Sequence, residues 1–200
     1  MDATVICISH AEGAEGAAVG RAVAGMLGYT FADDAIVSEA ARSAGIFAES
    51  LSYAERKDAK RSIEVDFGRI EKTENLRELI KDAIGTAADR GRIVITSHAA
   101  SFALADREEV LRVFVTAPDE TRAARLAESE GIDAKRAARE LSESDKGRAS
   151  YLERFYGVKN ERATDYDLVV NTEKLGAVAA ASLIAAAAGA EVPESTSPAA

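Results

Sequence analysis

The feature that most constrains this chain is a set of short apolar runs, rich in β-branched residues, that are separated by segments with helical spacing. The runs span residues 4–8, 29–31, 92–96, 111–116 and 167–171. Runs that are continuously apolar, rather than alternating with polar residues, are typical of parallel strands covered by helices on both faces. We therefore predict an α/β fold with a five-stranded parallel sheet in strand order 2-3-1-4-5 and right-handed crossovers.

The segments between the runs carry apolar residues at three- and four-residue intervals, which predicts amphipathic helices. Gly28 and Gly157 follow two of these segments and are typical of residues just past a helix end. A long charged helix is expected to begin at Asp133, and Pro118 is expected in the first turn of the helix before it. The alanine-rich residues 177–190 predict a packed C-terminal helix, because they are too few to span a bilayer.

The first run enters a helix through Gly13 and Gly16, so the opening of the chain is predicted as strand, loop and helix. In this geometry the backbone N–H groups and the positive end of the helix dipole point at one spot, which suits a phosphate group. The common phosphate-binding pattern Gly-x-x-x-x-Gly-Lys-Ser/Thr is incomplete, since Ala17 and Ala18 follow Gly16. An alternative is that the glycines only allow a tight turn and close helix–strand packing.

Length and charge restrict the organisation and the partners. Two hundred residues with 47% hydrophobic content predict one domain over residues 1–190, followed by a disordered, proline-containing tail over 191–200. The net charge of −9 argues against a nucleic-acid partner, although it is compatible with a small nucleotide. The lone Cys7 is interpreted as a small buried hydrophobe in a reducing compartment. Without an export signal or a membrane span, we expect a cytoplasmic protein that has no membrane partner.

Two carboxylates, Asp33 and Asp34, follow the second run, and His98 follows the third. Because ligands bind beyond the carboxyl ends of parallel strands, the two aspartates are candidates for a sugar hydroxyl, a base amino group or a magnesium-bound water. A helix N-cap is the alternative for this pair. His98 is either a ligand-facing side chain or a structural histidine.

Basic residues follow the fourth run. Arg122 and Arg125 lie three residues apart on one helix face, where such a pair can clamp a phosphate. Alternatively they form a solvated face, paired with Glu120 and Glu128. The long charged helix over 133–157 is either a cover over the site or an amphipathic helix facing solvent.

Taken together, these segments resemble the cytidylate-kinase-like proteins, relatives of the nucleoside monophosphate kinases with the P-loop fold. The resemblance runs from Thr4 to about Ile184 and rests on five motifs. They are the glycine loop at 9–20, Phe-Ala-Asp-Asp-Ala-Ile at 31–36, Arg-Val-Phe-Val-Thr-Ala-Pro with the two arginines at 112–125, Asp-Lys-Gly-Arg with the following aromatics at 145–157, and Tyr-Asp-Leu-Val-Val-Asn-Thr at 166–172. The resemblance implies a three-layer P-loop NTPase-type fold with a helical lid, here residues 133–157.

The resemblance also implies phosphoryl transfer from ATP, with Mg²⁺, to a nucleoside monophosphate. The donor phosphates are then expected at Ser9, Gly13, Ala14, Glu15, Gly16, Ala17 and Ala18. Catalytic charge stabilisation is expected from Arg122, Arg125 and Arg148. The acceptor is expected near Asp33, His98, Asp145, Arg148 and Tyr151, and any metal at Asp33 or Asp34.

The glycine loop departs from the family pattern in its charge. Ala17 replaces the family's loop arginine, Glu15 replaces its second glycine, and His10 replaces an arginine after Ser9. Glu12 adds a further negative charge, and the Gly-Arg-Gly that commonly ends the family's third strand is absent. Each charge-assisted contact is worth about 1.5–3 kcal/mol, so we expect weak or absent ATP binding.

Three functions remain compatible with the sequence. The first is a kinase of this family with altered loop chemistry. The second is an inactive relative that serves as a nucleotide-binding, regulatory or scaffolding module. The third is a dinucleotide-binding protein that uses Gly13, Gly16 and Gly20 with Asp33 on a ribose, but this function leaves the arginine pair and the lid motif without a role. A homo-oligomer is compatible with each of them.

Overall fold

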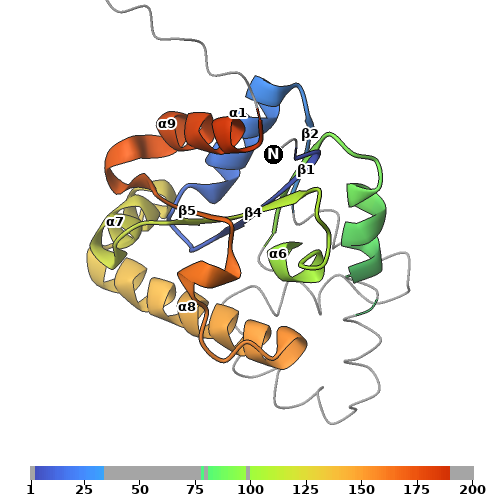
Figure 1. The fold of residues 1–200 in the computed structure, drawn as a ribbon. Helices are drawn as coiled ribbons and strands as arrows, with labels where there is room; N and C mark the ends of the chain where they lie inside the picture. Colours follow the sequence, from blue (N-terminus) through green and yellow to red (C-terminus); the bar gives the residue numbers. More distant parts are fainter. Residues whose placement is uncertain (1–2, 34–77, 79–80, 98–99, 190–200) are drawn as a thin grey trace, which may run out of the picture.

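The computed structural model describes residues 3–33, 78, 81–97 and 100–189. Its centre is a parallel sheet in the order β2-β3-β1-β4-β5, as predicted (Figure 1). The strands are β1 (Val5–His10), β2 (Thr30–Ala32), β3 (Ile93–Thr96), β4 (Val110–Thr116) and β5 (Leu168–Asn171). Each strand ends within one residue of the end of its predicted run. The exception is β1, which continues to His10. The predicted tail over 191–200 lies outside the described residues.

Helices cover both faces of the sheet. The labelled ones are α1 (Gly16–Leu27), α6 (Ala100–Ala103), α7 (Asp119–Glu130), α8 (Ala134–Tyr156) and α9 (Thr172–Ala187), with a 3₁₀ turn at Ala163–Asp165. Residues 81–88 are also helical. Figure 1 shows α1 and α9 side by side on one face of the sheet and α6 on the other. Helix α8 runs below the sheet, on the same side as α6.

Alternating side chains of β1 supply both halves of the core. Ile6 and Ile8 pack with residues of α1 and α9, whereas Val5 and Cys7 pack with residues of α6 and of the helix at 81–88. All four side chains are fully buried, which explains why the run is continuously apolar. Burial raises the pKa of the Cys7 thiol to about 12, so this cysteine behaves as the buried hydrophobe predicted from the sequence.

The helix ends follow the local sequence signals closely. Gly28 and Gly157 adopt left-handed conformations, with φ of 62° and 69°, and their N–H groups close α1 and α8. The Asp133 carboxylate accepts the backbone N–H of Arg136 and thereby caps α8. Pro118 is the exception, because it precedes α7 as the N-cap residue rather than lying in the first turn. In the described ranges, no helix is both long and apolar enough to cross a membrane.

Close packing between α1 and the sheet depends on Gly20. A Cβ atom there would lie 2.3 Å from the Thr96 hydroxyl and 2.9 Å from the Phe31 ring. We expect Gly20→Ala to lower the free energy of unfolding by about 1–3 kcal/mol, because the buried Thr96 and the partly buried Phe31 must move. Gly25→Ala in the same helix is the control. It meets no atom within 4 Å, so it should raise stability by about 0.5–1 kcal/mol. Equal effects in urea denaturation would refute the packing role of Gly20.

Candidate functional site

The loop between β1 and α1 forms one wall of the candidate site. Its turn is closed by a hydrogen bond from the Ala14 N–H to the Ala11 carbonyl of 3.1 Å, with Gly13 at φ 74°. Glu15 is the N-cap residue of α1, in a left-handed conformation at φ 63°, and no side chain caps this helix. The first N–H groups of α1 have no intrahelical acceptors and form the positive end of the helix dipole, and no side chain takes them up here. This geometry suits an anion, and phosphate binding at this loop stays a prediction.

The loop glycines also serve packing, which was the alternative interpretation. A Cβ atom on Gly13 would lie 2.5 Å from the Arg122 carbonyl oxygen, and one on Gly16 would lie 2.2 Å from the His10 ring. Both positions therefore exclude a larger residue. The two interpretations are compatible, because close packing brings α7 up to the loop where an anion would bind.

Arg122 of α7 is buried against this loop, with only 6% of its side chain exposed. It makes a two-pronged contact with Asp145 of α8 at 2.9 and 2.8 Å, and it also donates to Asp119 and to the Glu12 carbonyl. The Asp145 carboxylate raises the pKa of Arg122 above its ordinary value. Its Nε is buried without a hydrogen-bond partner among the described residues. The alternative of a solvated arginine paired with Glu120 is therefore wrong for Arg122.

Arg125, one helical turn further along α7, contacts the same loop. Its guanidinium lies 3.2 Å from a carboxylate oxygen of Glu15. It also donates to the Thr172 hydroxyl at 3.0 Å, to the Thr172 carbonyl at 2.9 Å and to the Gly13 carbonyl at 3.5 Å. The Glu15 carboxylate of the loop thus pairs with Arg125, the arginine that we predicted would face a transferring phosphoryl group.

Arg148 projects from α8 toward the end of β4. It donates to Glu161 at 3.0 Å and to the Tyr166 hydroxyl at 3.1 Å, and it lies over the Phe114 ring at 5.3 Å from the ring centre. The Tyr166 hydroxyl also contacts Glu161, and its ring stacks on Phe114. Only 9% of the Arg148 side chain is exposed, so the position of this cation is fixed by several contacts.

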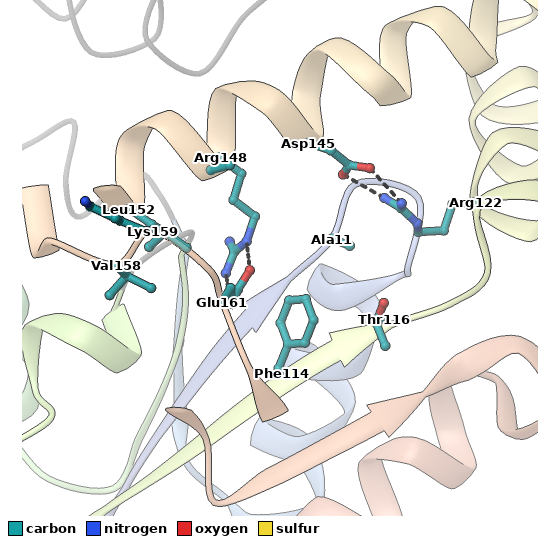
Figure 2. Close-up of a pocket in the computed structure, with 11 residues that line it drawn as sticks. Ala11, Phe114, Thr116, Arg122, Asp145, Arg148, Leu152, Val158, Lys159 and Glu161 are labelled. Atoms are coloured by element: carbon teal, nitrogen blue, oxygen red, sulfur yellow. Dashed lines mark hydrogen bonds and ion pairs between the residues drawn. The ribbon is translucent and has the colours of Figure 1, made fainter. Parts of the chain in front are cut away.

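A pocket of about 210 Å³ lies between the β1–α1 loop, the end of β4 and α8. Figure 2 shows Arg148 paired directly with Glu161 beside the Phe114 ring, with the Arg122–Asp145 pair near Ala11. The described residues around it are Ala11, Phe114, Thr116, Arg122, Asp145, Arg148, Ala149, Leu152, Val158, Lys159 and Glu161. The pocket therefore combines an aromatic surface with arginines that are already paired with carboxylates.

Other predicted site residues lie apart from this pocket. Ser9 is fully buried, and its hydroxyl lies 3.1 Å from that of Ser101. The ring of Tyr151 stacks on Phe155 and does not line the pocket. Asp33 follows β2 as predicted, with its carboxylate 3.9 Å from Arg21. Asp34 and His98 lie outside the described residues.

The fit to magnesium is poor over the part of the chain that the structure describes. No group of three or more His, Cys, Asp or Glu side chains there is arranged to hold a metal ion. Asp33 is 46% exposed and is the one described member of the predicted pair. Ala18, in the first turn of α1, supplies no hydroxyl. These residues alone do not build a magnesium site.

Sequence reasoning missed four side chains that shape the site. Phe114 and Thr172 belong to the motifs noted above, but neither received a role. Lys159 and Glu161 lie in the connection after α8, where no periodicity or motif distinguishes them from other charged residues. Only their position against Phe114 and Arg148 makes them part of the pocket.

Known proteins resemble this chain in sequence. Residues 5–174 match the model of the cytidylate kinase-like family. A cytidylate kinase of Staphylothermus marinus is 28% identical over 140 residues, which cover 70% of this chain and 70% of that protein.

Solved structures resemble the fold at lower sequence identity. An uncharacterized protein from Eubacterium ventriosum aligns with a TM-score of 0.71 and 18% identity, covering 94% of this chain and 99% of its own. Shikimate kinase from Bacteroides thetaiotaomicron aligns with a TM-score of 0.54 and 16% identity, covering 90% and 96%. Together with the sheet order, these likenesses confirm the predicted three-layer P-loop NTPase-type fold.

Proposed function

This chain belongs to the cytidylate kinase-like family, and from that premise we propose that it is a nucleotide phosphotransferase that carries the terminal phosphoryl group of ATP to a nucleoside monophosphate. The observation that carries the proposal is the convergence of Arg122, Arg125 and Arg148 around the β1–α1 loop and the adjoining pocket. Phosphoryl transfer depends on positioning and on stabilising charge, which is what arginines around a helix N-terminus supply.

We assign the donor phosphates to the β1–α1 loop. The uncapped first turn of α1 offers backbone N–H groups, and Arg125 lies against the loop beside them. Glu15 occupies Arg125 in the ligand-free chain, so a phosphate group must take the place of that carboxylate. This exchange makes donor binding weaker than in a loop without the glutamate.

We assign the acceptor to the pocket beside Phe114. A nucleobase or sugar can pack in the pocket beside Phe114 and the Arg148 guanidinium over it, while Arg122 and Arg148 line the wall to meet a phosphate group. The unpartnered Nε of Arg122 leaves one buried donor in that wall for an anionic oxygen. Asp145 orients the Arg122 guanidinium and links α7 to α8. The orientation of this arginine therefore depends on the position of α8.

We expect magnesium to reach the protein as the ion bound to ATP. When bound, it would neutralise charge on the donor phosphates. Of the two predicted ligands, Asp33 lies near the end of β2 and Asp34 lies outside the described residues. We therefore assign the magnesium ion to the ATP phosphates. Asp33 or Asp34 would at most complete its coordination shell.

Calorimetric titration tests the binding, and measurement of ADP formation tests the chemistry. We expect ATP with magnesium to bind weakly, one or more nucleoside monophosphates to bind, and ADP to form only when both are present. The matched nucleoside without a phosphate is the control, because it keeps the base and sugar and loses the arginine contacts. Failure of every nucleotide to bind at millimolar concentration would overturn the proposal.

A second candidate function has its own support. Each of the three arginines is already paired with a carboxylate, namely Asp145, Glu15 or Glu161. Such internal pairing is compatible with an inactive relative that keeps the fold as a nucleotide-binding, regulatory or scaffolding module, because none of these three arginines is left uncompensated for a phosphate. Nucleotide binding without any ADP formation in the same assay would favour this second function.

A further inference from the structure

Three consecutive carbonyl groups of the β1–α1 loop are held from outside the loop. Arg122 donates to the Glu12 carbonyl at 3.2 Å, and Arg125 donates to the Gly13 carbonyl at 3.5 Å. The Thr172 hydroxyl donates to the Ala14 carbonyl at 3.0 Å. The three donors come from α7 and from the start of α9, so none of them belongs to the loop itself.

We propose that Thr172 is a positioning residue that, with Arg122 and Arg125, holds these carbonyls outward and so turns loop N–H groups toward the anion site. The peptide bonds described in the structure contain no cis isomer, and the C=O and N–H of a trans peptide point in opposite directions. Holding the carbonyls of Glu12 and Ala14 on one side therefore turns the N–H groups of Gly13 and Glu15 to the other side. The N–H of Ala14 is used within the loop, by the Ala11 carbonyl.

Thr172 is the member of this group that reaches the loop with a hydroxyl rather than a guanidinium. The residue is fully buried, and its hydroxyl accepts from Arg125 at 3.0 Å while it reaches the Ala14 and Thr116 carbonyls at 3.0 and 3.3 Å. A hydroxyl can donate and accept at once, which a methyl group cannot. Thr172 thus connects the end of β4, the loop and the α7 arginine at one point.

The second contact between Thr172 and Arg125 strengthens the case for a positioning role. Arg125 also donates to the Thr172 carbonyl at 2.9 Å, so its guanidinium is gripped by the backbone and the side chain of one residue. The same guanidinium holds Glu15, whose left-handed backbone is unfavourable for a residue with a side chain. The peptide between Ala14 and Glu15 is therefore held at both of its residues.

The inference rests on the proposed function in one respect, because it takes the inner side of the β1–α1 loop as the anion site. Its test uses Thr172→Val, which keeps the side-chain shape, and Thr172→Ser, which keeps the hydroxyl. Backbone NMR of the ligand-free protein reports the ¹³C′ shift of Ala14 and the N–H order parameter of Glu15. Titration with inorganic pyrophosphate reports the anion site.

For Thr172→Val we expect a changed Ala14 ¹³C′ shift and a fall of the Glu15 order parameter from about 0.85 to below about 0.6. Pyrophosphate should bind about tenfold more weakly. Thr172→Ser should restore all three values, which a loss of packing alone would not explain. A folded Thr172→Val protein with an unchanged Ala14 shift and an unchanged Glu15 order parameter would overturn the inference.

Two further outcomes keep the test decisive. If Thr172→Val does not fold, Arg125→Lys replaces it, because lysine keeps the charge but cannot make the two-pronged contact with Thr172. The same loosening of the Ala14–Glu15 peptide is then expected, and an unchanged peptide overturns the inference. If the wild-type protein binds neither pyrophosphate nor any of the nucleotides at millimolar concentration, the proposed function fails, while the two NMR readouts still decide the role of Thr172.

Discussion

Replacing Glu15 by glycine and Ala17 by arginine is expected to strengthen ATP binding at least tenfold, a gain of about 1.4 kcal/mol. The first change releases Arg125 from the carboxylate 3.2 Å away and removes a side chain from a left-handed backbone position. The second places a cation in the first turn of α1, where the family pattern has one. Two unit charges about 4 Å apart near a surface interact by roughly 4 kcal/mol, so removing a competing anion outweighs the 0.3–1 kcal/mol typical of a helix terminus.

The control for this experiment is Glu12→Gln. Glu12 lies in the same loop, but Arg122 contacts its backbone carbonyl rather than its carboxylate. An equal gain from Glu12→Gln would mean that net charge matters and that the Glu15–Arg125 pair does not. If the native chain already binds ATP at micromolar affinity and the double variant adds nothing, the three arginines Arg122, Arg125 and Arg148 hold the phosphates, and the loop N–H groups and the Glu15–Arg125 pair do not limit binding.

Arg148→Met is expected to lower the free energy of unfolding by about 3 kcal/mol, the largest loss that we expect from a single substitution. Removing one partner of a fully buried ion pair typically costs about 3–5 kcal/mol, because the other charge is left without compensation. We expect the lower end of that range here, because 21% of the Glu161 side chain is exposed. Glu161 would keep only the Tyr166 hydroxyl of its described partners here, and the Phe114 ring would lose the guanidinium above it. Urea denaturation, followed by circular dichroism, measures the change.

Arg162→Met is the matched control, because Arg162 pairs with Asp165 at 3.3 Å while 72% of its side chain is exposed. An exposed pair contributes about 0–1 kcal/mol, so this variant should remain close to the wild type. The capping contact from the Arg162 backbone N–H to Asp165 is kept. If both variants lose the same stability, burial of the Arg148–Glu161 pair has no special importance.

The local sequence was sufficient for the sheet and for most helix ends. Five short apolar runs rich in β-branched residues, separated by helical segments, favour strands of a covered parallel sheet, and the connection rules leave few orders for them. Asp133, Gly28 and Gly157 act on the backbone of their own turn, so their effect is visible in the sequence. The family was also visible in the sequence, because four of its five motifs include or directly follow a predicted strand, while the fifth, at 145–157, lies in the long charged helix α8.

The partners of the site arginines were decided by the tertiary structure. Asp145 lies three residues before Arg148 on α8, a spacing that allows the two to pair, yet Asp145 binds Arg122, 23 residues away in the chain. Arg148 turns instead to Glu161, and Arg125 to Glu15. Arginine and carboxylate side chains reach several neighbours at similar energy. Their pairing therefore depends on how α7 and α8 pack against the β1–α1 loop, which no local spacing in the sequence encodes.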